Sequence, residues 1–168
     1  MVINELLEQT VKGNASDLHL VVGTPPTLRI NGALSPLSQY PPLTKQTLEE
    51  LVFSVVTPQQ KEYLLTNKEI DFSYSYSQDS LGEVGRFRIN AYYQRGYLSC
   101  EFRFLPAKIR NVEELNLPGI LHEFTKLRQG FILMTGPTGH GKSTTLAAII
   151  NEINQTRAVH ILTIEDPI

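Results

Sequence analysis

Gly136-Pro137-Thr138-Gly139-His140-Gly141-Lys142-Ser143 is the stretch that decides the fold of the second half of this chain. The pattern Gly-x4-Gly-Lys-Ser is typical of a loop whose backbone N–H groups, with the N-terminus of the following helix, bind phosphate. The loop follows an apolar run at residues 130–135 and precedes a helix predicted over residues 142–154. Another apolar run, at residues 160–164, completes a strand–loop–helix–strand order. Because neither run alternates with polar residues, we expect two buried parallel strands in a βαβ unit.

Each position of the loop has an expected role. The glycines allow backbone angles, and a close approach to phosphate, that a side chain would prevent. Lys142 is expected to reach the β- and γ-phosphates, and Ser143 to supply a hydroxyl to Mg²⁺. Thr144 is expected near the α-phosphate or simply continues the helix, while the side chain of His140 should point away from the phosphates. The sequence therefore predicts a site for a nucleoside triphosphate with magnesium. The residues expected to contact the nucleotide are Gly136, Pro137, Thr138, Gly139, His140, Gly141, Lys142, Ser143 and Thr144.

An acidic pair, Glu165-Asp166, directly follows the second apolar run. In an open parallel sheet, ligands bind beyond the carboxyl ends of the strands, so we expect this pair beside the phosphate loop. A carboxylate there can polarise an attacking water or hold magnesium through a water. We favour Glu165 as the acid nearer the chemistry, with a solvated acidic turn before Pro167 as the alternative interpretation.

The first 105 residues alternate short helices and strands. A helix is predicted at 3–12 and strands at 17–22, 27–30 and 33–37, with Asn31-Gly32 as a hairpin turn. Further helices are predicted after Thr44 and from Pro58, followed by strands at 70–76, 84–93 and 98–104. We therefore expect an α+β unit built on a mixed sheet.

The strand predicted at residues 84–93 has one apolar and one basic face. Apolar residues at 87, 89 and 91 alternate with polar ones at 86, 88 and 90, two of which are arginines. One face is therefore expected to be buried and the other to present arginines. From the pattern alone, Arg88 on this strand and Arg103 on the next fit a solvated sheet face as well as a functional surface.

Composition narrows the class of protein. Of the 168 residues, 41% are hydrophobic and 19% charged, with a net charge of −2, so we expect a packed core and no nucleic-acid partner. Cys100 is the single cysteine of the sequence, which excludes an intramolecular disulfide and a cysteine metal cluster. The N-terminus lacks the pattern of a signal peptide, and the apolar runs are shorter than the roughly 20 residues that cross a bilayer. We expect a cytoplasmic protein without membrane insertion. Lone histidines are expected to be structural: His19, His122 and His160.

Four segments resemble the twitching-motility ATPases (PilT family), the type IV pilus retraction motors of the secretion-ATPase superfamily. They are residues 15–20 (Ala-Ser-Asp-Leu-His-Leu), 85–91 (Gly-Arg-Phe-Arg-Ile-Asn-Ala), the loop region 136–145, and 161–168 (Ile-Leu-Thr-Ile-Glu-Asp-Pro-Ile). The resemblance runs along the whole chain in order. It implies a PAS-like α+β domain at residues 1–105 and the first part of a RecA-like α/β P-loop domain at 119–168. Residues 106–118, which hold two prolines and no sustained period, are the expected linker.

The resemblance also implies an activity and partners. It predicts ATP and Mg²⁺ as ligands, ATP hydrolysis coupled to pilin disassembly, a homohexameric ring, and a platform protein of the inner membrane on whose cytoplasmic side the motor works. Residues 163–168 are similar to the start of the family's Asp box, which gives Glu165 a role near the γ-phosphate. Arginines of the family's N-terminal domain reach toward the nucleotide and correspond best to Arg88 and Arg103. With Lys142, these three residues form the expected catalytic set.

Two alternatives remain from the sequence. Pilus-assembly and type II secretion ATPases share the loop and the Asp box, although a helix that starts at residue 3 favours the retraction type. Because the family's Walker B and histidine-box segments do not occur in residues 119–168, we expect the N-terminal portion of a motor. A truncated start of the ATPase domain could also act as a non-hydrolysing nucleotide-binding or interaction module.

Overall fold

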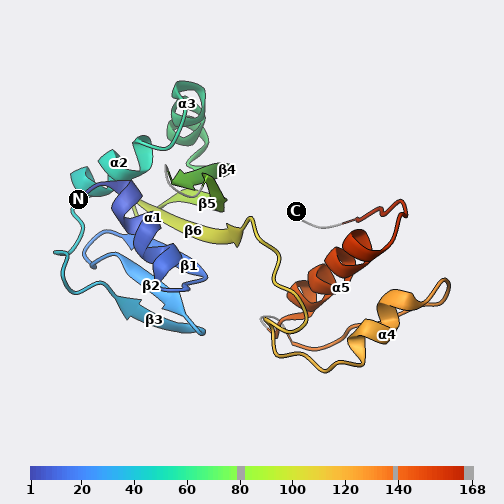
Figure 1. The fold of residues 1–168 in the computed structure, drawn as a ribbon. Helices are drawn as coiled ribbons and strands as arrows, with labels where there is room; N and C mark the ends of the chain where they lie inside the picture. The colour runs from blue at the N-terminus through green and yellow to red at the C-terminus, as the bar shows by residue number, and fades with distance from the viewer. Residues whose placement is uncertain (79–81, 138–139, 165–168) are drawn as a thin grey trace. The chain divides into compact units, whose positions relative to one another are not determined.

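The computed structural model describes residues 1–78, 82–137 and 140–164 of the chain (Figure 1). Its residues gather into two compact units, Met1–Ala107 and Lys108–Ile168. The assignment of residues 106–118 as a linker stays a prediction. Among the described residues, no helix is long and apolar enough to cross a lipid bilayer.

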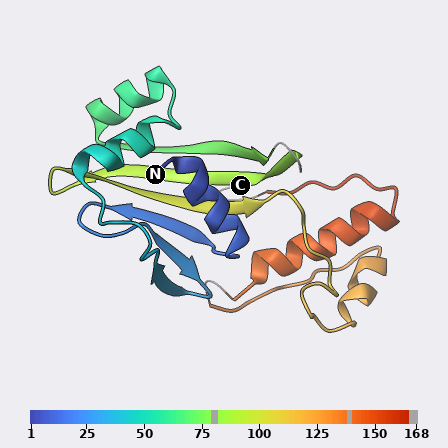
Figure 2. The same ribbon diagram turned by 60° about the vertical axis from the view of Figure 1, so that its left-hand side comes forward.

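The first unit is built on a six-stranded sheet with the strand order β3-β2-β1-β6-β5-β4 (Figure 2). Its strands are β1 (Asp17–Val21), β2 (Thr27–Ile30), β3 (Ala33–Pro36), β4 (Glu69–Gln78), β5 (Gly82–Gln94) and β6 (Tyr97–Pro106). Every paired strand is antiparallel to its neighbour, so the expectation of a mixed sheet is wrong. The physical reason is that short turns join β2 to β3 and β5 to β6, and a short turn reverses the chain.

Local signals in the sequence set two helix starts and a hairpin turn in this unit. Asn31 and Gly32 have φ of 50° and 84°, as the expected two-residue hairpin turn requires. Helix α2 (Lys45–Phe53) begins after Thr44, whose side chain accepts the N–H of Thr47. Helix α3 (Pro58–Asn67) begins with a reciprocal pair of hydrogen bonds between Thr57 and Gln60. These predicted starts are confirmed.

One face of the sheet is buried under helices. Leu6 and Leu7 of α1 (Ile3–Lys12) and Leu48 of α2 are fully buried against Phe87 and Phe102 and their neighbours in one apolar cluster. Cys100 also lies on this face, where burial raises the pKa of its thiol. The opposite face of the same strands carries charged side chains, as the alternation in β5 predicts.

The second unit is smaller and contains two described helices, α4 (Leu121–Lys126) and α5 (Lys142–Thr156). Its buried residues include Val112, Thr125, Ala148 and Ile149. Helix α4 is shorter than the helix expected at residues 119–127, because hydrogen bonds to Pro118 and Gly119 form turns before it. Helix α5 confirms the helix predicted after the glycine-rich loop.

The two apolar runs of the second unit do not form the strands expected of them. Residues 130–137 and 157–164 carry no strand pairing within the described part of the chain. Phe131 is 86% exposed and Ile164 is 93% exposed. A β-strand exists through hydrogen bonds to a neighbouring strand, and apolar side chains become buried only against a second layer. The expected βαβ unit is therefore wrong here as a pair of buried strands.

Candidate functional site

The glycine-rich loop leads into helix α5, and two of its residues have positive φ angles that favour glycine. Gly136 has φ of 149°, and Gly141, the residue that caps the N-terminus of α5, has φ of 80°. A Cβ atom at either position would meet nothing within 4 Å. Glycine is therefore required by the left-handed backbone and not by a lack of space. The predicted contacts of Thr138 and Gly139 lie outside the described residues.

Lys142 lies across this loop. Its Nζ donates a hydrogen bond to the backbone carbonyl of Pro137 at 2.7 Å, and its side chain is half-buried. The ammonium group is thus placed between the first turn of α5 and the entrance of the loop. Because an ammonium is a point charge with three donors, it can exchange a carbonyl oxygen for a phosphate oxygen without moving far.

The first turn of α5 supplies donors and a positive partial charge. The first helical hydrogen bond runs from the N–H of Thr145 to the carbonyl of Gly141 at 2.8 Å. The N–H groups that precede Thr145 in a helix start lack intrahelical acceptors, and the helix dipole adds positive potential at this end. Ser143 and Thr144 are exposed in this turn. The hydroxyl of Ser143 is a hard oxygen ligand of the kind that Mg²⁺ prefers.

Other predicted site residues around the loop are not tested by the structure. Glu165 lies outside the described residues, so its role near the γ-phosphate stays a prediction. His140 is exposed in the loop, and the expectation that its side chain points away from phosphate also stays a prediction.

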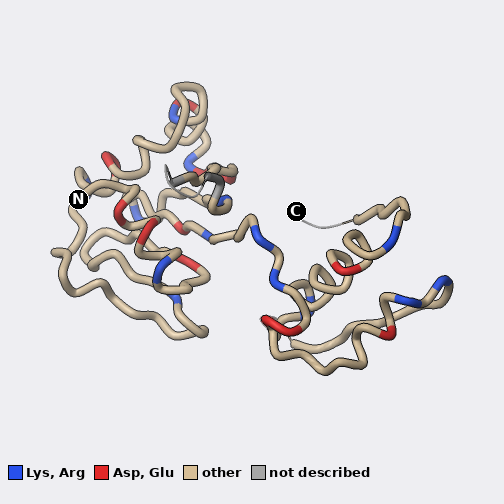
Figure 3. The backbone as a smooth tube through the Cα atoms, in the orientation of Figure 1, with Lys and Arg blue, Asp and Glu red and all other residues tan. Residues whose placement is uncertain are grey.

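Arg88 and Arg103 lie directly opposite each other on β5 and β6. With Asp71, Asn90 and Glu101 they line an open depression of about 240 Å³ on the sheet face that carries the charged side chains. Figure 3 shows that the first unit carries both acidic and basic positions. The structure therefore brings the two predicted arginines together in one place on the first unit.

The two arginines are held by different carboxylates. The Nε of Arg88 donates to both oxygens of Asp71 at 3.1 and 3.0 Å, and the side chain of Asp71 is 41% exposed. The Nε of Arg103 donates to Oδ1 of Asp17 at 3.0 Å, and its Nη2 donates to Glu101 at 3.1 Å. The side chain of Asp17 is only 6% exposed. Arg103 is thus anchored by a buried carboxylate, and Arg88 by an exposed one.

Asp17 has a second arginine on its other side. Arg29 on β2 and Arg103 on β6 are both directly opposite Asp17 in the sheet. The Nε of Arg29 lies 3.4 Å from Oδ2, and the hydroxyl of Ser16 donates to the same oxygen at 2.7 Å. Burial acts to raise the pKa of the Asp17 carboxyl, but the hydrogen bonds from Ser16 and Arg103 and the charge of Arg103 outweigh it and lower the pKa. Asp17 therefore stays ionised between two guanidinium groups.

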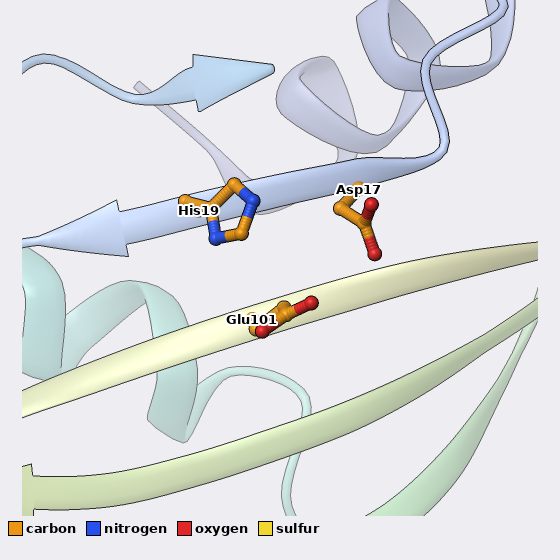
Figure 4. Close-up of side chains that lie close together, drawn as sticks. All are labelled: Asp17, His19 and Glu101. Carbon is orange, nitrogen blue, oxygen red and sulfur yellow. The ribbon is translucent and has the colours of Figure 1, made fainter. Parts of the chain in front are cut away.

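Asp17, His19 and Glu101 form a group that could hold a cation (Figure 4). One potential ligand atom from each lies within 4.8 Å of the others. The same atoms already face arginines, since the Nη2 of Arg29 lies 3.2 Å from Nε2 of His19 and Arg103 bonds both acids. Two guanidinium charges at this distance would repel a divalent ion. The group is better explained as the set of acceptors that orients the arginines.

Reasoning from the sequence did not identify Asp17, Arg29 or Glu101. The alternation of residues 17–21, with Leu18 and Leu20 buried, does place Asp17 on the charged face of the sheet. Which strands flank it is not visible in that pattern. Another hollow of the first unit, about 710 Å³, lies between α3 and the start of β4. It shares only Asp71 with the arginine depression, and Asp71 is already bound to Arg88.

A polar network joins the two helices of the second unit. On α4, the Nδ1 atom of His122 lies 2.9 Å from a carboxylate oxygen of Glu152 on α5. The Nε2 atom of the same ring lies 3.1 Å from a carboxylate oxygen of Glu113. The hydroxyl of Thr125 also donates to Glu152, and Arg157 donates to the carbonyls of Thr125 and Leu127. The hydrogen bond to Glu152, followed by the charges of Glu152 and Glu113, raises the pKa of His122. The helix that begins with Lys142 is thus tied to α4 by charged side chains.

Known proteins resemble this chain along its length. Residues 108–168 match the family described as Type II/IV secretion system protein. The chain is 39% identical over 168 residues to the type IV pilus retraction ATPase PilT of Pseudomonas aeruginosa, of which it covers 47%. It is 40% identical over 143 residues, 85% of its length, to a twitching motility protein of Neisseria gonorrhoeae, of which it covers 37%.

A solved structure gives the same match. The crystal structure of the pilus retraction motor PilT with bound ADP aligns with the whole chain at a TM-score of 0.77 and 42% identity, and the chain covers 48% of it. The chain therefore spans about half the length, or less, of these relatives. The similarity confirms the resemblance of the chain to the twitching-motility ATPases. It also confirms the expected fold class, an α+β unit followed by the start of a secretion-ATPase P-loop unit.

Proposed function

We propose that this chain, which is similar to PilT and to the type II/IV secretion ATPases, binds ATP as part of a type IV pilus retraction motor. The observation that carries the proposal is the start of α5. A left-handed glycine at position 141 leads into a helix of 15 residues, and the ammonium of Lys142 lies across the preceding loop on the carbonyl of Pro137. Backbone donors, a helix dipole and a cation converge there, which is what a polyphosphate needs.

Each residue has a proposed task. Residues 136–144 hold the phosphates through backbone N–H groups, and Lys142 neutralises the β- and γ-phosphate oxygens. Ser143 would hold Mg²⁺, which when bound supplies charge neutralisation at those oxygens. Arg88 and Arg103 present guanidinium groups to the charge that develops on the γ-phosphate. Glu165 would orient the attacking water.

The assembled state belongs to the same proposal. We expect a homohexameric ring on the cytoplasmic side of the inner membrane, in contact with a platform protein of the pilus machine, where ATP turnover drives removal of pilin subunits. Pilus assembly or type II secretion is the alternative within the family. A nucleotide-binding module without turnover is the alternative of another class, and the unpaired apolar runs at 130–137 and 157–164 favour it.

The test is nucleotide affinity measured with a fluorescent ATP analogue, with and without Mg²⁺, on the whole chain. Lys142→Ala should weaken binding roughly 10- to 100-fold, because a charge-assisted contact is removed. Ser143→Ala should remove the dependence on Mg²⁺. Lys126→Ala is the matched control, since Lys126 is an exposed lysine of the same unit that forms an ion pair with Glu123.

Four outcomes decide the proposal. Equal affinities for Lys142→Ala and Lys126→Ala would refute the phosphate-binding role of the loop. Binding with ATP turnover supports the motor, and binding without turnover supports the non-hydrolysing alternative. A mass measurement in solution with a non-hydrolysable ATP analogue tests the ring, and a strict monomer would count against it.

A further inference from the structure

We propose that Asp17 is a positioning residue that fixes the guanidinium group of Arg103 for contact with a bound phosphate. The role rests on the proposed function of Arg103. Asp17 does not itself touch the nucleotide in this scheme. It acts through the hydrogen bond that it accepts from Nε of Arg103 at 3.0 Å.

The first support is the contrast in exposure between the two side chains. The side chain of Asp17 is 6% exposed, whereas that of Arg103 is 56% exposed. The carboxylate is therefore fixed in the sheet, and the guanidinium that it holds still faces solvent. Arg103 contacts Asp17 through Nε and Glu101 through Nη2, so its Nη1 group takes part in neither of these two hydrogen bonds. That group remains in a defined direction for an incoming anion.

The second support is that Asp17 is itself held from several directions. Ser16 donates to Oδ2 at 2.7 Å, and Arg29 approaches the same oxygen from the neighbouring strand. The backbone of Ser16 is fixed as well, since its N–H donates to the carbonyl of Arg29 and its carbonyl accepts the N–H of Phe104, both at 2.9 Å. A group that must orient another within a fraction of an ångström needs this kind of support.

The third support comes from energetics. A buried carboxylate is costly to desolvate, and an ion pair with an exposed arginine returns little stability. Apolar residues of similar volume in place of the ion pair would stabilise the sheet at least as well. The arrangement is therefore better explained by orientation of the arginine than by stability of the fold. Arg88 lacks such an anchor, because its partner Asp71 is 41% exposed.

The experiment uses the full chain and two independent readouts. The first is the Nε–H resonance of Arg103 in ¹⁵N-labelled protein, assigned by its disappearance in Arg103→Lys. In Asp17→Asn this signal should shift and exchange faster with water. An unchanged signal would overturn the anchor, whatever the nucleotide does.

The second readout is affinity for the fluorescent ATP analogue with Mg²⁺. Arg103→Gln and Asp17→Asn should each weaken binding roughly 10-fold, and the double variant should bind no more weakly than Arg103→Gln alone. Asp71→Asn, the same chemical change on the same sheet face, should weaken binding of the ATP analogue less than Asp17→Asn does. Independent, multiplying losses in the double variant would show that Asp17 has only a structural role.

The outcomes separate this inference from the function on which it rests. If Lys142→Ala leaves affinity unchanged, the phosphate loop fails, while the resonance of Arg103 still tests the anchor. If Lys142→Ala weakens binding but Arg103→Gln does not, the positioning role is overturned. Circular dichroism checks that Asp17→Asn is folded. Should it unfold, Asp17→Glu retains the charge with oxygens displaced by one methylene, and an affinity equal to the parent would contradict the inference.

Discussion

Residues 1–107 and residues 108–168 are stabilised by different forces. In the first unit, a six-stranded sheet buries Phe87, Phe102 and their apolar neighbours under α1 and α2. In the second, few of the described residues are buried, among them Thr125, Ala148 and Ile149, and the network around His122 and Glu152 joins the two described helices. Large apolar side chains such as Phe131 remain exposed there. The difference teaches that the first unit buries a continuous apolar core, whereas the apolar runs of the second unit are largely exposed in its described residues.

The largest expected effect compares one phenylalanine from each unit. Phe102 is fully buried and Phe131 is 86% exposed. Phe102→Ala should lower the free energy of unfolding of the first unit by about 3–5 kcal/mol, since it leaves a cavity in the core. Phe131→Ala should change stability by less than about 0.5 kcal/mol. Denaturant unfolding followed by circular dichroism measures both, and similar losses would break the comparison.

A glycine substitution tests the entry to α5 in the second unit. Gly141→Ala forces a side chain into left-handed backbone and should cost roughly 1–2 kcal/mol of helix stability. Gly119 has open space around its Cβ position and is not among the residues with positive φ, so Gly119→Ala is the matched control. Thermal unfolding followed at the helical circular dichroism signal is the measurement. Equal effects of the two changes would contradict the described loop geometry.

The N-terminal cap of helix α3 tests whether contacts between near neighbours in the sequence stabilise the first unit. Thr57→Ala removes the hydroxyl that accepts the N–H of Gln60 and should cost about 1 kcal/mol. Thr66 is an exposed threonine on the same helix, so Thr66→Ala controls for the loss of the side chain itself. Chemical denaturation should separate the two variants. Equal free energies of unfolding for the two variants would show that the hydroxyl of Thr57 does not stabilise the start of the helix.

The smallest expected effect is a pH dependence confined to the second unit. The folded state raises the pKa of His122 above its ordinary value of 6.5, through its hydrogen bond to Glu152 and the charges of Glu152 and Glu113. The contact therefore stabilises the unit fully below about pH 6.5 and is lost as pH rises through the folded-state pKa. NMR titration of the His122 ring should show the raised pKa, and Glu152→Gln should lower it. A titration unaffected by Glu152→Gln would show that the two side chains do not interact.

The sequence was informative where structure depends on near neighbours. Thr44, Thr57 and Asn31-Gly32 set two helix starts and a turn by contacts within three residues, and all are confirmed. The glycine-rich loop that we propose binds phosphate is predictable for the same reason, because its glycines and Lys142 are contiguous. The prediction of strands at 130–135 and 160–164 is wrong, because an apolar run indicates that a segment tends to be buried but does not identify the strand or helix that would pack against it.

The role of Asp17 was hidden for a related reason. Asp17 and Arg103 are 86 residues apart in the sequence and meet only through the register of β1 and β6. The alternation of each strand fixes which face a side chain occupies. It does not fix which strands become neighbours, and that choice depends on the packing of the whole sheet.

Hydrogen exchange on the whole chain, with and without a non-hydrolysable ATP analogue and Mg²⁺, tests the central claim most directly. If phosphate binds at the start of α5, the amides of residues 136–146 should exchange more slowly when the nucleotide is added, because N–H groups of the loop and first helical turn then donate to phosphate oxygens. The same experiment on Lys142→Ala should show little protection. Protection confined to residues 1–107, or equal protection in Lys142→Ala, would contradict the account.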